Sequence, residues 1–592
     1  MSSSIIVPAE LDQLCINTIR TLSMDAVERA KSGHPGTPMA LAPLAYSLWT
    51  RHMKHDPGAP DWADRDRFIL SAGHASMLLY SMLYLTGYGL EREEIINFRQ
   101  WESRTPGHPE HGMTPGVETT TGPLGQGISN AVGMAIAEAR LAALFNTPEN
   151  PIVDHYTWVI CSDGDLMEGV SSEAASLAGH LGLGKLICFW DDNSITIEGS
   201  TDLAFTEDVL ARYEAYGWQT LRVDDVNDLD AIDAVVRAAK ADPRPTMVGV
   251  KTVIGFGSPN KAGSEDAHGA PLGEAEIRLT KQALGWPEDE AFLVPEAALA
   301  HMRMQQQRGE AARAEWNARL DQLASLNPER AAGFLTTLEC QLSEGWDAGI
   351  PTFDKPIATR AASGKVLNAI ASRVPWLVGG SADLAGSNNT NIDGEGSLSH
   401  ADPAGRNIHY GVREHGMGSV MNGMALHGGV RPYGATFLIF SDYMRPPIRL
   451  ASLMEQPVIY VFTHDSIGLG EDGPTHQPVE QMAALRAIPG LVDLRPADAA
   501  ETAEAWRWIM ENPNGPAFLA LTRQALPILD RTKYGSVKGI RRGGYILAEA
   551  EGGAPSVILI ASGSEVELAL AAREKLQSEG VPTRVVNLIS WA

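Results

Sequence analysis

The sequence predicts an α/β protein with two parallel-sheet domains covered by helices, followed by a smaller C-terminal α/β domain. First, 592 residues are too many for one hydrophobic core, so several domains are expected. Second, apolar runs of strand length alternate with helical stretches, which is typical of parallel sheets. Third, the apolar runs end in polar or glycine-rich loops, and the carboxyl edge of such a sheet is where ligands bind.

The first domain is predicted over residues 1–330. The helical stretches include 10–31 and 127–145, and the buried strands include 156–161, 186–190 and 246–252. From residue 297 to 350 the chain is rich in Ala, Glu, Gln and Arg and poor in β-branched residues. This composition predicts a helical connector that starts near residue 297.

A second α/β pattern predicts a domain over residues 331–540. The runs WLVGGSADL (376–384), PVIYVFTHD (457–465) and AFLALTR (517–523) each indicate a buried strand that enters a polar loop. A third domain is predicted over residues 541–592, where 554–588 forms one strand–turn–helix–strand unit. One such unit cannot cover both faces of a sheet, so we expect this domain to be incomplete or to lean on a neighbour.

Composition and charge restrict the kind of protein. Hydrophobic residues make up 44% and charged residues 20%, as in ordinary globular proteins. A formal net charge of −26 argues against nucleic-acid binding, and phosphorylated substrates would need a local basic pocket. The four cysteines lack metal-ligand spacing, no secretory signal is seen, and no apolar run approaches membrane-spanning length. We expect a cytoplasmic protein without a nucleic-acid or membrane partner.

Two acidic loops follow neighbouring predicted strands. They read CSDGDLMEG (161–169) and DDNSI (191–195). Loops at the same end of a parallel sheet converge, and their carboxylate and amide oxygens are ligands that Mg²⁺ or Ca²⁺ prefers. The alternative is structural: Asp163 and Asp165 would cap the following helix, and residues 191–193 would form an Asx turn.

Further motifs make the chain similar to the transketolase family of thiamine-diphosphate-dependent enzymes. They are KSGHPG (31–36), TTTGPLGQG (119–127) and IGFGSPNKAG with HGAPLG (254–273), and the resemblance covers nearly the whole chain. It implies that both sheet domains bind thiamine diphosphate, the first its diphosphate and the second its pyrimidine. The family usually has Gly at Ser162, an aromatic residue at His415 and Pro at Gly386.

The resemblance implies a metal and a diphosphate site in the first domain. Mg²⁺, or Ca²⁺, would be bound by Asp163, Asn193 and the carbonyl group of Ile195. The residues implied to contact the diphosphate part of the cofactor are His74, Gly122, Pro123, Leu124, Gly164, Asn193 and His268. The glycine-rich turn 122–124 precedes a predicted helix, so its backbone N–H groups can approach an anion closely.

In the second domain, HYGVREHGM (409–417) contains the carboxylate implied to activate the cofactor. Glu414 would hydrogen-bond the aminopyrimidine ring, and it should be buried with a raised pKa. The alternative is a surface ion pair with Arg413. Phe437, Phe440 and Tyr443 are spaced three apart, so we expect them along one side of a helix, as a pyrimidine slot or as core packing.

The resemblance also implies a sugar-phosphate site around THDSIGLGEDGPTHQP (463–478). The phosphate-binding residues would be Arg360, Ser387, His464 and Arg523, and Asp472 would bind a sugar hydroxyl group. His108 and His476 would contact the hydroxyl groups nearest the reacting carbonyl, and His34 and His268 would handle the proton beside the bond that breaks. Each arginine alone is more typical of an ordinary surface charge.

The implied function is transketolase activity. A two-carbon ketol unit would pass from a ketose phosphate such as xylulose 5-phosphate to ribose 5-phosphate or erythrose 4-phosphate, through a covalent intermediate on the cofactor. A homodimer is implied, with Glu414 serving the cofactor of the other chain, in the pentose phosphate pathway or the Calvin cycle. Dihydroxyacetone synthase and 1-deoxyxylulose 5-phosphate synthase share the scaffold and remain alternatives, as does a non-enzymatic binding protein.

Overall fold

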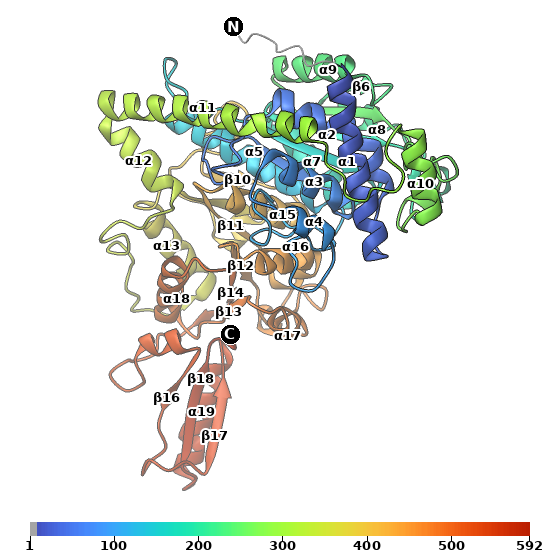
Figure 1. The fold of residues 1–592 in the computed structure, drawn as a ribbon. Helices are drawn as coiled ribbons and strands as arrows, with labels where there is room; N and C mark the ends of the chain where they lie inside the picture. Colours follow the sequence, from blue (N-terminus) through green and yellow to red (C-terminus); the bar gives the residue numbers. More distant parts are fainter. Residues whose placement is uncertain (1–8) are drawn as a thin grey trace. The chain divides into compact units, whose positions relative to one another are not determined.

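The computed structural model describes residues 9–592, which form two compact units (Figure 1). Unit 1 ends at Gly333, and unit 2 covers Phe334–Ala592. Each unit is built around a parallel sheet, so the predicted fold class is confirmed.

Unit 1 contains a five-stranded, all-parallel sheet with the order β1-β2-β3-β7-β6. The strands are β1 (Arg67–Leu70), β2 (Thr157–Ser162), β3 (Leu186–Asp192), β6 (Gln219–Val223) and β7 (Thr246–Lys251). In the register of the central pair, Ser162 lies opposite Asp191, so the two acidic loops leave the sheet side by side. A short antiparallel pair, β4 (Ile195–Thr196) and β5 (Gly199–Ser200), follows the second loop.

Helices surround this sheet, which is why its central strands are apolar without alternation. The helices are α1 (Ala9–Ala30), α2 (Gly36–Ser47), α3 (Ser76–Thr86), α4 (Arg92–Ile96), α5 (Gln126–Phe145), α6 (Asp163–Met167), α7 (Gly169–Leu181), α8 (Val209–Ala215), α9 (Leu229–Ala241) and α10 (Glu274–Ala283). The strand residues Trp158, Ile160 and Phe189 are fully buried in the core of unit 1.

Helix α5 corrects one expectation. It is long and apolar enough to cross a membrane, although no apolar run of that length was expected. Its most apolar window is 72% buried inside the fold, and the helix packs against β2 and α7. Helix α5 is thus a largely buried helix of unit 1, and this burial explains its apolar composition.

The predicted helical connector consists of two helices. They are α11 (Glu296–Leu326), the long yellow-green helix in Figure 1, and α12 (Pro328–Leu338). Helix α11 packs against α1 and α3 of unit 1. Its start at Glu296 agrees with the connector expected near residue 297.

Unit 2 contains a six-stranded parallel sheet with the order β10-β9-β11-β12-β14-β13. The strands are β9 (Leu377–Ser381), β10 (Asn407–His409), β11 (Arg431–Phe437), β12 (Ile459–Thr463), β13 (Val492–Leu494) and β14 (Ala517–Leu521). The helices are α13 (Thr359–Ala371), α14 (Ala385–Asn388), α15 (Glu414–His427), α16 (Ser441–Leu453), α17 (Gln481–Arg486) and α18 (Ala499–Glu511). A small antiparallel pair, β8 (Ile357–Ala358) and β15 (Ala525–Leu526), accompanies it.

The end of the chain forms a three-stranded sheet. The expected strand–turn–helix–strand unit is present as β17 (Val557–Ala561), α19 (Glu565–Ser578) and β18 (Thr583–Leu588). The sequence did not indicate β16 (Gly544–Ala548), which pairs antiparallel with β18. Val566 and Val585 lie in the same buried cluster as Trp506 of α18, so this sheet shares its core with the rest of unit 2.

Candidate active site

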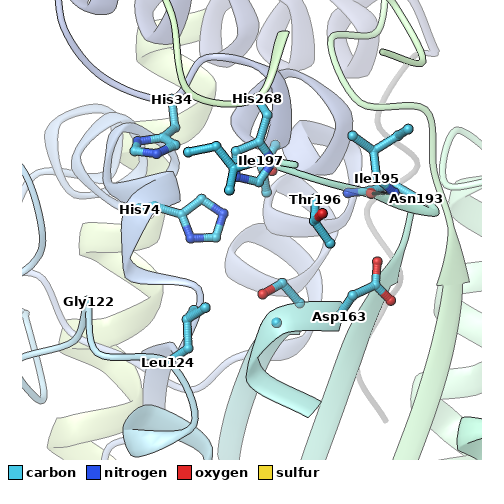
Figure 2. A pocket seen from close by; sticks show the side chains of 13 residues that line it. His34, His74, Gly122, Leu124, Asp163, Asn193, Ile195, Thr196, Ile197 and His268 are labelled. Atoms are coloured by element: carbon cyan, nitrogen blue, oxygen red, sulfur yellow. Dashed lines mark hydrogen bonds between the residues drawn. The ribbon is translucent and has the colours of Figure 1, made fainter. Parts of the chain in front are cut away.

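A pocket of about 250 Å³ lies where the polar loops of unit 1 meet (Figure 2). Its lining residues are His34, Thr37, His74, Gly122, Leu124, Ser162, Asp163, Gly164, Asn193, Ile195, Thr196, Ile197 and His268. Figure 2 shows the rings of His34 and His74 across the pocket from Asp163. The pocket therefore brings together the two acidic loops, the glycine-rich turn and three of the predicted histidines, His34, His74 and His268.

The two aspartates of the first acidic loop have different roles. Asp165 is fully buried, and its Oδ2 accepts hydrogen bonds from the backbone N–H and the hydroxyl group of Ser162, at 2.9 and 3.0 Å. Asp165 completes a capping box at the start of α6, whose N-cap is Ser162, so the structural alternative holds for Asp165 and not for Asp163. Asp163 uses only Oδ1, which accepts from Trp190 Nε1 at 2.8 Å. Its Oδ2 is buried and has no hydrogen-bond partner within residues 9–592.

The electrostatics around Asp163 favour a cation. Burial raises the pKa of Asp163 to about 7, and the neighbouring Asp191 and Asp192 carboxylates add to the rise, while the Trp190 hydrogen bond opposes it. A buried carboxylate oxygen without a partner is costly. A divalent cation would satisfy this oxygen and offset the repulsion between the carboxylates.

Asn193 forms the Asx turn that the structural alternative predicted. Its Oδ1 accepts from the backbone N–H of Ile195 at 2.8 Å, and its Nδ2 donates to Asp191 Oδ2 at 2.7 Å. The hydroxyl group of Thr252 donates to the other oxygen of Asp191 at 2.5 Å. The amide oxygen of Asn193 keeps a second lone pair for a metal, so the turn and a metal site are compatible.

No group of three His, Cys, Asp or Glu side chains with metal-binding geometry occurs in the described part of the chain. The predicted ligand set contains one carboxylate, one amide and one backbone carbonyl, so it is not a group of that kind. Oxygen ligands of this mixture suit Mg²⁺ or Ca²⁺, which complete their coordination with phosphate and water. The residues present therefore fit a hard cation.

The glycine-rich turn before α5 allows a close backbone approach. Gly122 has φ +133°, a conformation that L side chains rarely adopt. A Cβ at Gly164 would lie 2.7 Å from Leu124 Cδ1, so the acidic loop and the turn are in contact. Gly122 and Leu124 line the pocket, and the turn leads into the N-terminus of α5, an arrangement suited to an anion.

Four histidines gather on one side of the site. The ring centroid of His34 lies 5.1 Å from that of His74, 5.6 Å from that of His268 and 6.4 Å from that of His108. Burial, as the main cause, lowers the pKa of all four, to about 4 for His34. The Nδ1 atoms of His34 and His268 are buried without a hydrogen-bond partner in residues 9–592. These rings are neutral near pH 7 and can accept or donate protons.

Unfolding is expected to take up protons at this histidine cluster. Because the folded-state pKa of His34 is about 4 and its ordinary value is 6.5, the unfolded chain binds more protons between these values. The stability from His34 is fully present above pH 6.5 and is lost as the pH falls through about 4. A plot of Tm against pH should show this loss, and His34→Gln should reduce its slope. An unchanged slope in that variant would contradict the expectation.

In unit 2, Glu414 is the first residue of α15, and only 8% of its surface is exposed. The hydroxyl group of Thr436 donates to Glu414 Oε1 at 3.2 Å. Arg413 donates to the backbone carbonyl of Tyr410 at 2.9 Å. Glu414 is thus a buried carboxylate and not the surface partner of Arg413 that the alternative required.

The three predicted aromatic residues stack, but not along one helix, so that expectation is wrong. Phe437 ends strand β11, Phe440 lies in a single 3₁₀ turn and Tyr443 lies in α16. Ring centroids are 5.9 Å apart for Phe437 and Phe440 and 6.0 Å apart for Phe440 and Tyr443. Phe437 is buried, whereas Tyr443 is 64% exposed. The row of rings thus leads from the core to the surface, along a strand, a turn and a helix that follow one another directly.

His464 links this aromatic row to the predicted phosphate site. Its ring centroid lies 3.8 Å from that of Phe437, and its backbone has the left-handed φ of +60°. Burial lowers the pKa of His464 to about 4, and the Arg360 and Arg523 charges add to this while Asp472 opposes it. His476 packs its ring against Phe440, with centroids 5.3 Å apart.

The two predicted arginines lie close enough to affect each other. Burial, and after it the charge of Arg523, lowers the pKa of Arg360, whose Nη1 donates to the backbone carbonyl of Ser387 at 2.7 Å. Arg523 pairs with Glu471. Unit 2 therefore gathers the predicted sugar-phosphate residues Arg360, Ser387, His464, Asp472, His476 and Arg523. Two neighbouring guanidinium groups favour an anion such as phosphate.

Some pocket residues were not assigned from the sequence. Thr37 follows the KSGHPG motif, and Thr196 and Ile197 follow Ile195, so proximity to motifs was the only available signal. Arg99 was also missed: its charge contributes to the lowered pKa values of His34 and His108. Its place beside the histidines results from a loop whose course the sequence did not indicate.

Comparisons with known proteins find matches along nearly the whole chain. Family models match three consecutive segments: the transketolase thiamine diphosphate binding domain over residues 11–343, the transketolase pyrimidine binding domain over 355–528 and a transketolase-like C-terminal domain over 543–592. The transketolase of Halalkalibacterium halodurans is 55% identical over 583 residues, which cover 98% of this chain and 87% of that protein.

Solved structures are similar over the same length. A Pichia stipitis transketolase in complex with sedoheptulose 7-phosphate has a TM-score of 0.95 and 47% identity, covering 98% of this chain and 86% of that one. A mutant of that organism's transketolase in complex with xylulose 5-phosphate has the same TM-score and coverage at 46% identity.

Proposed function

This chain belongs to the transketolase family, and we propose that it carries a ketol unit from xylulose 5-phosphate to ribose 5-phosphate or erythrose 4-phosphate with the residues described above. The enzyme is a transferase of ketol groups between sugar phosphates, and it uses thiamine diphosphate. The observation that carries the proposal is the pocket of unit 1. It combines an unpartnered buried carboxylate oxygen, a glycine-rich turn and neutral histidines.

The cofactor site is proposed in unit 1. Asp163, the amide oxygen of Asn193 and the carbonyl group of Ile195 would hold Mg²⁺ or Ca²⁺. The residues proposed to contact the diphosphate are His74, Gly122, Pro123, Leu124, Gly164, Asn193 and His268. When bound, thiamine diphosphate supplies the carbon nucleophile and the electron sink that carbon–carbon cleavage needs.

Glu414 is proposed to hold a proton at the aminopyrimidine ring, and Phe437, Phe440 and Tyr443 to provide its aromatic slot. Burial of Glu414 supports this role, because a carboxylate in an apolar site can keep a hydrogen bond to a ring nitrogen free of competing water. We propose a homodimer in which Glu414 of one copy serves the cofactor held by the other copy.

The remaining residues would bind and orient the sugar. Arg360, Ser387, His464 and Arg523 would hold the phosphate, and Asp472 would accept from a hydroxyl group. His108 and His476 would position the reacting carbonyl end. His34 or His268 would take the proton of the hydroxyl group beside the breaking bond and return it to the acceptor, which their lowered pKa values permit near pH 7.

Several expectations stay predictions. They are the three-domain division at 1–330, 331–540 and 541–592, the cytoplasmic location, and a place in the pentose phosphate pathway or the Calvin cycle. The solved Pichia stipitis complexes support xylulose 5-phosphate as the donor to test first.

A coupled assay tests the proposed substrates. With Mg²⁺ and thiamine diphosphate, xylulose 5-phosphate plus ribose 5-phosphate should yield glyceraldehyde 3-phosphate, with ping-pong kinetics. Replacing ribose 5-phosphate with formaldehyde, or the donor with pyruvate, tests the related synthases. Turnover only with formaldehyde or only with pyruvate would sink the proposed substrate pair.

A further inference from the structure

Asp165 connects three separate loops through hydrogen bonds. Its Oδ1 accepts from the hydroxyl group of Ser71 at 2.7 Å and from the backbone N–H of Gly125 at 2.8 Å. Its Oδ2 accepts from the N–H and the hydroxyl group of Ser162, at 2.9 and 3.0 Å. We call these four residues the Asp165 network. They belong to the end of β1, the turn before α5 and the start of the acidic loop.

Further contacts extend this network into α5. Ser71 receives a hydrogen bond on its hydroxyl oxygen from the N–H of Ile128 at 2.9 Å. The hydroxyl group of Ser129 donates to the carbonyl of Gly125 at 2.7 Å. The N-terminal turn of α5 is thus attached through side-chain hydrogen bonds to the end of β1, which lies 57 residues earlier in the sequence.

The backbones around the network leave no room for adjustment. A Cβ at Gly127 would lie 2.6 Å from Ser71 Cα, and a Cβ at Gly73 would lie 2.5 Å from the backbone N of Gly122. Such contacts are shorter than real Cβ contacts, so these segments approach as closely as glycine permits. The relative positions of the turn and β1 are therefore set by direct contact, and the carboxylate of Asp165 supplies the acceptors between them.

A helix cap needs only part of this arrangement. The bonds from Ser162 complete the cap of α6. The bonds from Ser71 and Gly125 cross to other segments, 94 and 40 residues away in sequence. Two residues before Asp165, Asp163 lines the pocket and has one buried oxygen without a hydrogen-bond partner in residues 9–592, and Gly122 and Leu124 of the turn line the same pocket. Asp165 thus sits between the candidate metal ligand and the candidate diphosphate turn.

We propose that Asp165 is a positioning residue that sets the spacing between Asp163 and the turn 122–125, so that both can contact one metal–diphosphate group. The inference rests on the proposed function, because it assumes that the pocket binds the diphosphate and the cation. Asp165 itself touches neither: all four hydrogen bonds of its carboxylate are to other residues of the chain, and it is fully buried.

The test uses the full chain and a probe that needs only unit 1, inorganic diphosphate with Mg²⁺, measured by calorimetric titration. Asp165→Asn places an amide NH₂ against N–H and O–H donors, so at least one bond of the network is lost. The Kd of inorganic diphosphate should rise about 10- to 100-fold, the size typical of residues that orient a metal site. Thermal unfolding is measured in parallel.

Asp66→Asn is the matched control. Asp66 is also buried in unit 1, and its carboxylate accepts three hydrogen bonds, from Lys54 N, Tyr156 N and Trp158 Nε1. Asp66 directly precedes β1, so it lies at the opposite end of that strand from Ser71. This variant should lower Tm and leave the Kd of diphosphate unchanged. If Asp165→Asn behaves like Asp66→Asn, with a lower Tm and a wild-type Kd, Asp165 is only structural and the proposal is overturned.

Ser71→Ala provides a milder variant should Asp165→Asn not fold. It removes one bond to Asp165 and the acceptor for Ile128, and a rise in Kd of about 3- to 10-fold is expected. A wild-type Kd would overturn the proposal. Asp163→Asn distinguishes failure of the positioning role of Asp165 from failure of the proposed cofactor site. If it abolishes diphosphate binding while Ser71→Ala and Asp165→Asn do not weaken it, only the positioning role fails. If the wild type does not bind diphosphate with Mg²⁺, the proposed cofactor site fails and the inference fails with it.

Discussion

Replacing Glu414 with Gln is expected to lower kcat by about 10²- to 10⁴-fold, the usual contribution of a positioned acid or base. Glu414 is almost fully buried, and Thr436 donates to its Oε1, so the other oxygen is available to a ligand. Gln has nearly the same shape but cannot share a proton with a ring nitrogen. The coupled assay with saturating thiamine diphosphate measures kcat, and calorimetry measures the Kd of the cofactor.

The Kd should change far less than kcat, because the amide can still form one hydrogen bond. Glu511→Gln serves as the control, since Glu511 lies at the end of α18 and pairs with Arg541 on the surface. It should have wild-type turnover. Wild-type kcat in Glu414→Gln would show that the carboxylate has no part in the chemistry.

The main elements of the fold could be predicted from the sequence because their signals are local. Apolar runs such as residues 186–190 in β3 have the length of a strand, and they end in polar loops. Strand β16 was missed because it belongs to the sheet only through its antiparallel partner β18, which lies far along the chain. Pairing with a distant strand leaves no periodic pattern in a five-residue segment.

The local sequence pattern does not separate Asp163 from Asp165, and only the family resemblance singled out Asp163 as a metal ligand. Both are acidic, both follow β2, and either one suits a helix cap or a metal. The two aspartates differ in their hydrogen-bond partners. Ser71 and Gly125 donate to Asp165, whereas Trp190 donates to only one oxygen of Asp163. These partners come from other strands and loops, so only the folded chain shows them.

The aromatic row illustrates the same limit. A spacing of three residues predicts one face of a helix only if the segment is helical throughout. Here the segment leaves β11 at Phe437 and enters α16 after one turn. The three rings still stack on one another, although they lie on a strand, a turn and a helix.

Asp163→Asn is expected to weaken Mg²⁺ binding in the presence of thiamine diphosphate by more than about 100-fold, beyond the loss typical of residues that only orient ligands. The carboxylate would be the only charged protein ligand in the proposed set, and Asn removes that charge without changing the volume. Calorimetric titration of Mg²⁺ at a fixed cofactor concentration measures the loss. Asp192→Asn is the control: it removes a neighbouring charge that pairs with Arg222 and Lys251, so it should change the affinity much less.

In the absence of Mg²⁺, Asp163→Asn is expected to stabilise the folded protein. Burial raises the pKa of Asp163 to about 7 from an ordinary value of 3.8, so the folded chain favours the protonated acid. Its contribution to stability is present below pH 3.8 and is lost as the pH rises through about 7. Asn is neutral at every pH, so at pH 8 without Mg²⁺ the variant should have a higher Tm than the wild type. Adding Mg²⁺ and cofactor should raise the Tm of the wild type only, and an equal rise in both proteins would exclude Asp163 as the ligand.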